Sequence, residues 1–433
     1  MKRTLVMFVV LAIVLSLFTT CNKESGTSRA AGEKIRVEFW GHVNEAWNNS
    51  HRQMIQKFNA SQDRIEVVAT FFPYDDFEAK IQTSLMARGA GADLYEIWGG
   101  WGLDFSKSGA LSQVPADLIS DLLNDCYDPV MGAFNVNGRY FGVPLEFNNE
   151  YGGMLVNKVE FERLGIPYPK TWDEIINVAR RTTARNGNIF TMRGLDFTTD
   201  DTLTTTFLSM ILSQGGEYWV NGKFKLTTPE AERALKTLVD YVVVDRLTNT
   251  DSATGAQGDE IDGAHFLGQN NAMMVPRGPW VIALLEEEYG KTLGVDFDFI
   301  EFPFYSTIKA FPAETGWSMC VPQSSRVSEA AWEYVRFFLR PENLMQHNIA
   351  CAQLPPRKSV GSNPEFARQL PYMAPLLDKL QYGRFIGPFN TDVLKISLRN
   401  VFVSLCEGNS VYANIPIALT VLENQINNDL RLH

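Results

Sequence analysis

The first apolar run of the chain differs from every later one in its length and in its flanks. Residues 5–18 are apolar apart from Ser16, and two positive charges, Lys2 and Arg3, precede them. A helix that spans a bilayer needs roughly 20 apolar residues, so this run is too short for a comfortable span. A charged start followed by a short apolar run predicts a signal peptide over residues 1–20, which is removed and takes no part in the fold.

Two kinds of periodicity alternate in the next part of the chain. Apolar residues recur with period two over residues 34–40, 65–71 and 93–98, which predicts three strands. Between them, apolar residues at helical spacing predict helices that include residues 47–58 and 75–87. The order strand, helix, strand, helix, strand predicts a parallel α/β sheet, in which ligands bind beyond the carboxyl ends of the strands.

A second cycle of strands and helices begins after a turn at Asn137-Gly138. The apolar segment 151–156 comes first, and Thr171 with Glu174 three residues later has the pattern of a capping box at the start of a helix. Further helices are expected near residues 200–213, 229–245, 279–289, 328–339, 342–350, 391–406 and 412–428.

The chain is acidic as a whole. It has 39 Lys and Arg against 50 Asp and Glu, and its formal charge is −11. Removal of residues 1–20, which hold Lys2 and Arg3 and no acidic residue, makes the charge −13. Nucleic acids are bound by basic patches, so we expect no nucleic acid as a partner. The roughly 410 residues that remain exceed what one hydrophobic core supports, so two domains are expected.

The cysteines fall into two groups. Cys21 ends the segment Leu17-Phe18-Thr19-Thr20-Cys21, which resembles a bacterial lipobox, and a stretch rich in Ser, Gly and Lys follows it. Residues 21–32 are therefore interpreted as a lipidated N-terminus with a flexible tether. We expect the exported protein to be anchored by this lipid to the outer face of the cytoplasmic membrane, in the periplasm or at the cell surface. A plain secretory signal, with Cys21 unmodified, is the alternative.

The remaining cysteines lack the spacing of a metal site. They are expected to be buried thiols, and an exported location also permits disulfides between them. This group consists of Cys126, Cys320, Cys351 and Cys406.

Four short motifs stand in a fixed order along the chain. They are Asn137-Gly138-Arg139-Tyr140-Phe141-Gly142-Val143-Pro144, then Pro169-Lys170-Thr171-Trp172-Asp173-Glu174, then Gly278-Pro279-Trp280, and last Gly316-Trp317 with Leu354-Pro355-Pro356-Arg357. In residue type and order they resemble the family 1 extracellular solute-binding proteins of ABC sugar importers, which include maltose-binding protein. The resemblance covers nearly all of residues 33–433.

This resemblance implies an α/β, two-lobe periplasmic-binding-protein fold that is type II-like. Each lobe would hold a mixed β-sheet flanked by helices, and hinge crossings would join the lobes, which close on ligand. The expected N-terminal lobe holds residues 33–148 plus 315–361, and the expected C-terminal lobe holds residues 149–314 plus 362–433. The implied function is capture of a mono- or oligosaccharide and its delivery to the permease subunits of an ABC importer. We expect the protein to act as a monomer without a cofactor.

A sugar site needs aromatic rings that stack on C–H faces and polar groups that bond to hydroxyls. The stacking candidates are tryptophans beside glycine or proline at predicted element ends, namely Trp40, Trp98, Trp101, Trp280 and Trp317, with Gly316 next to the last. Packing between lobes is the alternative for Trp98 and Trp101. The other tryptophans, Trp47, Trp172, Trp219 and Trp332, are expected in the core.

The polar candidates lie in predicted loops and at helix starts. They are Asp76, Asn149, Glu150, Asp200 and Arg357. The resemblance supports Glu150, which stands seven residues before Asn157, as a residue of the cleft. Capping of the helix that follows is an equal alternative for Asp200. Arg357 could bond hydroxyls in bidentate fashion.

Motifs for catalysis and for metal binding are absent from the sequence. The five histidines form no metal-ligating pattern, and no nucleophile elbow, P-loop or dinucleotide fingerprint is present. We therefore expect a binding protein and not an enzyme. Three alternatives stay open, namely a non-sugar solute such as a polyamine, osmolyte or organic anion, a secreted enzyme that acts on glycans, and a surface adhesin or sensory co-receptor that kept the binding fold after losing its transporter.

Overall fold

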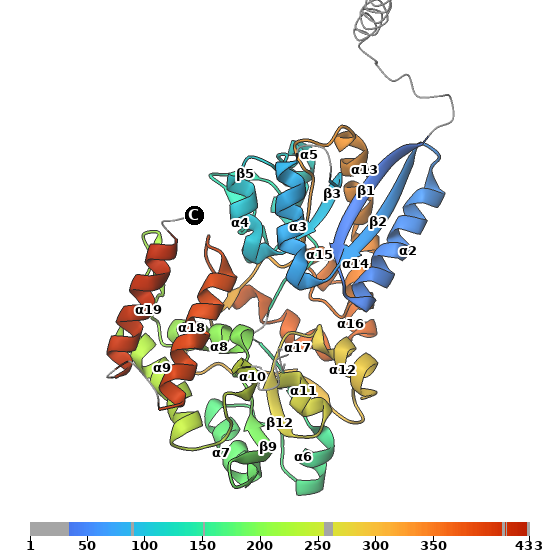
Figure 1. Ribbon diagram of the computed structural model, residues 1–433. Coiled ribbons are helices and arrows are strands. Elements are labelled where there is room, and N and C mark those ends of the chain that lie inside the picture. Colours follow the sequence, from blue (N-terminus) through green and yellow to red (C-terminus); the bar gives the residue numbers. More distant parts are fainter. Residues whose placement is uncertain are drawn as a thin grey trace, which may run out of the picture.

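The computed structural model describes residues 34–87, 91–149, 152–254, 263–408, 412 and 414–430. It confirms the α/β prediction, because helices flank two separate five-stranded sheets in this part of the chain. Figure 1 shows the two groups of elements, one with most of the blue and orange segments and one with most of the green, yellow and red segments. The predicted signal peptide and tether lie outside the described residues.

The first sheet is mixed and has the strand order β2-β1-β3-β15-β6. Its strands are β1 (Ile35–His42), β2 (Ile65–Phe72), β3 (Leu94–Ile97), β6 (Val143–Pro144) and β15 (Ser318–Cys320). Strand β1 runs parallel to β2 and β3, whereas β15 runs antiparallel to both β3 and β6. The first three strands confirm the period-two prediction, and the late strand β15 inserts between them and β6.

Helices from both ends of the sequence cover the first sheet. Helix α2 packs against β2, α13 against β1, and α14 against α2, so blue and orange elements lie side by side in Figure 1. The helices of this group are α2 (Glu45–Ser61), α3 (Tyr74–Met86), α4 (Gly99–Lys107), α5 (Ala116–Asp125), α13 (Ser328–Phe338), α14 (Pro341–Ala350) and α15 (Lys358–Gly361). A short hairpin, β4 (Asn135–Val136) with β5 (Arg139–Tyr140), forms at the predicted Asn137-Gly138 turn.

The second sheet has the strand order β13-β7-β12-β9-β8. Its strands are β7 (Gly153–Val156), β8 (Ala184–Asn186), β9 (Ile189–Leu195), β12 (Ala272–Pro276) and β13 (Asp298–Glu301). Strands β9 and β12 are parallel, and the other neighbours pair antiparallel. Both sheets are therefore mixed, as the fold prediction requires.

The helices of the second sheet include two from the end of the chain. Helix α18 packs against α8, α9 and α19, which places red elements beside green ones in Figure 1. The helices are α6 (Lys158–Leu164), α7 (Trp172–Thr182), α8 (Asp200–Ser213), α9 (Pro229–Val243), α10 (Asp251–Thr254), α11 (Gly263–Gly268), α12 (Val281–Tyr289), α18 (Thr391–Cys406) and α19 (Ile415–Asp429).

The predicted helix starts are largely confirmed. Thr171 is the N-cap of α7 and its side chain accepts a hydrogen bond from the Glu174 backbone N–H. The reciprocal half of the box differs, because the Glu174 carboxylate accepts a hydrogen bond from the Lys170 N–H and not from the Thr171 N–H.

Short pairings join the two groups of elements where the chain crosses between them. Strand β14 (Phe311–Ala313) pairs in parallel with β16 (Gly383–Phe385). Directly after β14, Glu314 forms an isolated antiparallel bridge with Asn148. Two crossing segments that are far apart in sequence are thus bonded to each other, while the predicted lobe boundaries themselves stay a prediction.

The thiols of the described chain are all unpaired. Cys126, Cys320 and Cys351 are buried, and Cys406 is half-buried, so the expected burial holds for three of the four. Within the described residues no helix has the length and apolar character that a membrane span requires.

Candidate functional site

The edge of the first sheet collects aromatic and polar side chains at one place. His42 ends β1, Trp98 follows β3, and Glu146 comes two residues after β6. Because β15 runs antiparallel to β3 and β6, its start lies at the edge where those strands end, so Trp317 joins the group. We call His42, Trp98, Glu146 and Trp317 the first wall.

The second sheet presents a different set at the ends of its two parallel strands. Thr199, Asp200 and Asp201 follow β9 at the start of α8, and Arg277 follows β12. Trp280 comes three residues later, and α18 adds Asp392 and Lys395. These seven residues are called the second wall.

A cavity of about 520 Å³ lies between the walls. All eleven residues of the two walls line it. The other lining residues are Asn44, Trp47, Tyr74, Asn148, Gln353 and Ile396. Small-molecule pockets typically enclose about 300–1,000 Å³, so this cavity has the size of a small-ligand site.

Parallel ring stacking organises the first wall. The His42 and Trp317 rings stack with centroids 3.9 Å apart and an interplanar angle of 2°, and the Trp98 ring lies 5.7 Å from Trp317. Gly316 has a φ of 74°, and a Cβ on it would come within 2.5 Å of the Glu146 side chain. Glycine is therefore needed for Glu146 to reach the Trp317 backbone N–H, which donates to its carboxylate at 3.0 Å.

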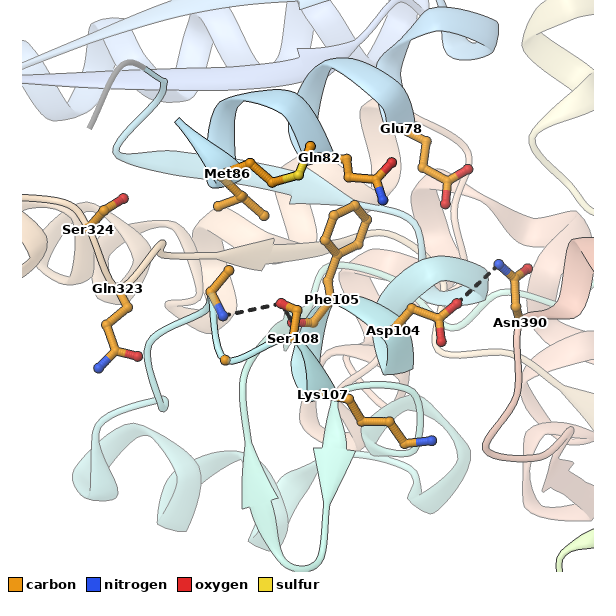
Figure 2. Close-up of a pocket in the computed structure, with 13 residues that line it drawn as sticks. Glu78, Gln82, Met86, Asp104, Phe105, Lys107, Ser108, Gln323, Ser324 and Asn390 are labelled. Atoms are coloured by element: carbon orange, nitrogen blue, oxygen red, sulfur yellow. Dashed lines mark hydrogen bonds between the residues drawn. The ribbon is translucent and has the colours of Figure 1, made fainter. Parts of the chain in front are cut away.

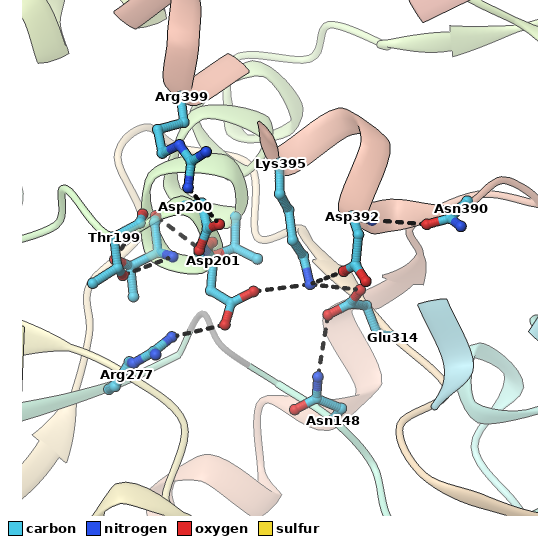
Figure 3. A network of polar contacts seen from close by, with 12 residues as sticks. Asn148, Thr199, Asp200, Asp201, Arg277, Glu314, Asn390, Asp392, Lys395 and Arg399 are labelled. Carbon is cyan, nitrogen blue, oxygen red and sulfur yellow. Dashed lines mark hydrogen bonds and ion pairs between the residues drawn. The ribbon is translucent and has the colours of Figure 1, made fainter. Parts of the chain in front are cut away.

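Ion pairs organise the second wall, as Figure 3 shows. The Asp201 carboxylate lies between Arg277 at 3.1 Å and Lys395 at 2.8 Å. Lys395 is also 3.5 Å from Glu314 and 3.7 Å from Asp392, and its ammonium group lies 5.3 Å from the Trp98 ring. The Arg277 guanidinium lies 4.9 Å from the Trp280 ring.

The charges of this network shift one another's pKa values. Burial opposes ionisation of Asp201, but Lys395 and Arg277 outweigh it and hold the pKa of Asp201 below its usual range. Burial raises the pKa of Asp200, and the neighbouring Asp201 charge adds to the increase. Burial also disfavours the Lys395 charge, yet Asp201, Glu314 and Asp392 raise the Lys395 pKa above its usual range. The network therefore keeps a buried ammonium group charged beside the cavity.

A larger groove of about 1,100 Å³ is lined by side chains of α3 and α4, several of which Figure 2 shows. Its lining includes Glu78, Asp104 and Asn390, and glycine and serine residues make up part of the rest. No tryptophan lines this groove. The smaller cavity combines stacking surfaces with polar groups, which makes it the better candidate for the ligand site. Among the described residues no group of three or more His, Cys, Asp or Glu side chains could hold a metal ion.

The sequence also matches a known protein family over most of its length. The model of the family described as bacterial extracellular solute-binding protein matches residues 48–345. The chain belongs to this family. Membership confirms the resemblance seen in the four motifs and implies that this solute-binding protein is exported.

A curated relative and two solved structures resemble this solute-binding protein. The multiple sugar-binding protein of Streptococcus mutans is 24% identical over 281 residues, which are 63% of this chain and 63% of the relative. The chain thus spans less than two thirds of that relative's length. A solute-binding protein from Thermotoga lettingae bound with alpha-D-tagatose is 20% identical, has a TM-score of 0.73, and is aligned over 92% of this chain and 100% of its own.

The second structure has the same coverage. It is an ABC substrate-binding protein from Listeria monocytogenes in complex with cycloalternan, 18% identical with a TM-score of 0.74 over 92% of this chain and 100% of that one. At these identities the two structures establish the two-lobe fold and no ligand.

Four of the candidate residues proposed from the sequence line the cavity of this solute-binding protein. They are Trp98, Asp200, Trp280 and Trp317. The capping alternative for Asp200 does not hold, because Thr199 is the N-cap of α8. Gly316 supports the first wall through its backbone, beside Trp317.

The other candidates within the described residues do not line the cavity. Trp40 packs against Phe72 and Tyr95 within the first sheet, and Asp76 is exposed in the first turn of α3. Trp101 is buried and its indole N–H donates to Asp392 at 2.9 Å. Asn149 is buried in the crossing next to Asn148.

Arg357 is buried and belongs to a separate ion-pair cluster. Its guanidinium is 2.9 Å from Asp121 and 2.6 Å from Asp125, and it donates to the Leu339 carbonyl at 3.1 Å. These contacts engage the guanidinium N–H groups of Arg357 that would otherwise donate to sugar hydroxyls. Glu150 and Cys21 lie outside the described residues.

Several lining residues have no signal in the sequence. Lys395 and Asp392 lie in a predicted helix, where charged residues are ordinarily exposed. His42 follows the predicted strand 34–40, and this place beyond a strand's carboxyl end is a signal that could have identified it. Trp47, expected in the core, is buried and also lines the cavity. Arg277 directly precedes the Gly278-Pro279-Trp280 motif, and this position beside Trp280 is a signal that could have identified it.

Proposed function

We propose that this protein binds a mono- or oligosaccharide in the cavity between its two walls and delivers it to an ABC-type importer. The observation that supports this most strongly is the combination within one cavity of tryptophan rings and a polar network. Stacked rings offer faces for the C–H surface of a sugar, and the carboxylates, amides and Lys395 offer partners for hydroxyl groups. The sugar-binding relative and the sugar-bound neighbours of similar fold agree with this proposal.

Isothermal titration with a broad panel of sugars tests the ligand class. The panel includes neutral mono- and oligosaccharides, an acidic sugar, a polyamine and a quaternary amine. Binding of a neutral sugar with a Kd in the micromolar range or below is the expected result. We do not expect an amine to bind, because it would have to compete with Lys395 and Arg277 for the same carboxylates. Binding of an amine and of no sugar would refute the sugar proposal.

Delivery and anchoring are the second part of the proposal. The lipid on Cys21 would hold the protein monomer beside its permease subunits at the outer face of the cytoplasmic membrane. Metabolic labelling with a radioactive fatty acid is expected to label the intact chain and not the Cys21→Ala variant. Label in both proteins, or in neither, would contradict lipidation at this residue.

We expect no chemical conversion of the ligand. The carboxylates at the entry of α8 are bound to Arg277, Lys395 and Arg399, and this engagement leaves them poorly suited to act as an acid and nucleophile pair. Incubation of a bound oligosaccharide with the purified protein, followed by chromatography, is expected to return the sugar unchanged. Release of shorter products would support the glycan-active enzyme instead.

A further inference from the structure

A buried carboxylate lies directly behind the first wall. Glu96 belongs to β3, and its side chain is fully buried. One oxygen, Oε2, is 2.9 Å from Nδ1 of His42 and also accepts the His42 backbone N–H at 3.2 Å. The other oxygen, Oε1, is 3.1 Å from Nε2 of His51, which belongs to α2. Both carboxylate oxygens therefore contact an imidazole.

The charge state of Glu96 decides which imidazole nitrogens carry a proton. Burial by itself raises the pKa of Glu96, but His42 and His51 outweigh burial and hold it well below its usual range. An ionised carboxylate can only accept hydrogen bonds. Each histidine must then present an N–H to it, which is Nδ1–H for His42 and Nε2–H for His51. The two rings on one carboxylate are thus fixed in opposite tautomers.

The contact with Glu96 determines which nitrogen of His42 remains available to the cavity. With Nδ1 held by Glu96 and the ring stacked on Trp317, Nε2 is left as the hydrogen-bonding atom of a residue that lines the cavity. Nε2 forms no hydrogen bond to any residue in the described part of the chain. In the neutral ring this nitrogen carries a lone pair and accepts a hydrogen bond.

We propose that His42 contacts the ligand through Nε2 and that Glu96 is a positioning residue that fixes the ring and its tautomer. The inference rests on the proposed sugar-binding function and narrows it to a ligand with a hydroxyl group at this position. A hydroxyl can donate to neutral His42 and accept from protonated His42. An ammonium group can only donate, so it could bond to this nitrogen only when the ring is neutral.

Other titratable groups surround this cluster and are part of its electrostatics. His347 of α14 lies 5.1 Å from His51 between ring centroids, and burial together with His51 lowers its pKa well below the usual value. Nδ1 of His347 lies 2.9 Å from the hydroxyl oxygen of Ser50. Tyr334, Cys351 and Glu146 are further titratable neighbours, and burial raises the pKa of both Tyr334 and Cys351, which keeps them neutral.

Nitrogen-15 NMR of histidine-labelled full-length protein tests the tautomers without any ligand. For the neutral rings, the expected spectrum shows His42 protonated at Nδ1 and His51 protonated at Nε2. Assignment uses the single variants His42→Asn and His51→Gln. A neutral His42 protonated at Nε2 would overturn the role of Glu96.

Titration of the same variants with a sugar found in the panel tests the ligand contact. Asn at position 42 can keep a hydrogen bond to Glu96 but has no atom at the position of Nε2. We expect Kd to rise about fivefold, the effect of one hydrogen bond, in His42→Asn. The matched control is His265→Asn in α11, a histidine that does not line the cavity, and its Kd is expected to stay unchanged.

Glu96→Gln separates positioning from contact. A glutamine amide can donate to Nδ1 of His42, which would reverse its tautomer, so we expect the NMR signature to change together with a rise in Kd. If Glu96→Gln fails to fold, the wild-type spectrum and His42→Asn still decide the inference. Unchanged sugar affinity in His42→Asn would refute it while leaving the proposed function intact. If no sugar binds the wild type, the proposed function fails, and the sugar-contact part of the inference fails with it.

Discussion

The two walls of the cavity are built from opposite kinds of interaction. The first wall consists of stacked rings on a rigid sheet edge, supported from behind by a buried carboxylate with two histidines. The second wall consists of charges that compensate one another, with Lys395 at the centre of three carboxylates. The first wall therefore carries most of the ring surface, and the second wall carries most of the charged groups, whose charges are already balanced. Because Lys395 and Glu314 are buried, we expect substitutions in this network to affect stability more than substitutions in exposed ion pairs.

The largest effect is expected from removal of the central cation. Lys395→Met leaves Asp201 and the buried Glu314 without their shared partner, and loss of one partner of a buried ion pair typically costs about 3–5 kcal/mol. Urea denaturation measures the free energy of unfolding. The control is Lys236→Met on α9, whose pair with Asp240 is exposed, and its cost is expected below about 1 kcal/mol. Equal costs for the two variants would show that the Lys395 network contributes no more to stability than an exposed ion pair does.

The next effect concerns stacking from the second wall. Trp280→Ala is expected to weaken sugar binding by about 2 kcal/mol, or about thirtyfold in Kd, because it removes an aromatic surface beside the ligand. Trp219→Ala is the matched control, since Trp219 is also half-buried but packs against Phe224 and Phe389 away from the cavity. Titration calorimetry compares the two. Similar affinities for Trp280→Ala and the control would show that only the first wall stacks on the ligand.

The pH dependence of stability should separate Glu96 from Glu314. The lowered pKa of Glu96 gives stability that is present above its unfolded value near 4.5 and is lost as pH falls below it. Glu314 has the opposite sign, because burial raises its pKa despite Lys395, so its contribution is present at low pH and is lost as pH rises.

Denaturation between pH 3 and pH 7 measures both contributions, each on the order of 1 kcal/mol. We expect Glu96→Gln to reduce the loss of stability on acidification. Glu314→Gln should make that loss steeper, because it removes the opposing contribution. The same sign of change in both variants would contradict this assignment.

The smallest effect is expected at Asp76. The side chain is exposed in α3 and does not line the cavity, so Asp76→Ala should change stability by less than about 0.5 kcal/mol and leave Kd unchanged. A clear loss of affinity would mean that the ligand extends beyond the cavity toward α3, and the cavity residues would then not be the whole site.

The fold could be predicted because its signals are local. Alternation in residues 34–40 and 65–71 gave β1 and β2, and the pattern over residues 391–406 matches α18 in full. Strand β15 and its place between β3 and β6 could not be read from alternation, since three residues are too few to show a period. The capping interaction of Thr171 was predictable because both partners lie within one helical turn.

The site could be predicted only in part, because several of its contacts join residues that are far apart in the sequence. Trp98, Trp280 and Trp317 were recognisable by neighbouring glycines and prolines. Lys395 was not, because its partners Asp201 and Glu314 are distant in sequence and nothing local marks a helical lysine as buried. For the same reason the sequence did not indicate that Arg357 forms ion pairs, because its partners Asp121 and Asp125 lie far away in sequence, in α5.

The bridge between Asn148 and Glu314 has a mechanical consequence. The two crossing segments are linked by a backbone hydrogen bond of 3.2 Å and by a side-chain hydrogen bond of 3.1 Å. Segments that are bonded side by side resist sliding past each other but can still bend together. Relative movement of the lobes would then be restricted to a rotation about approximately one axis. A ligand that draws the two walls together would therefore rotate the outer surfaces of the lobes in one defined direction.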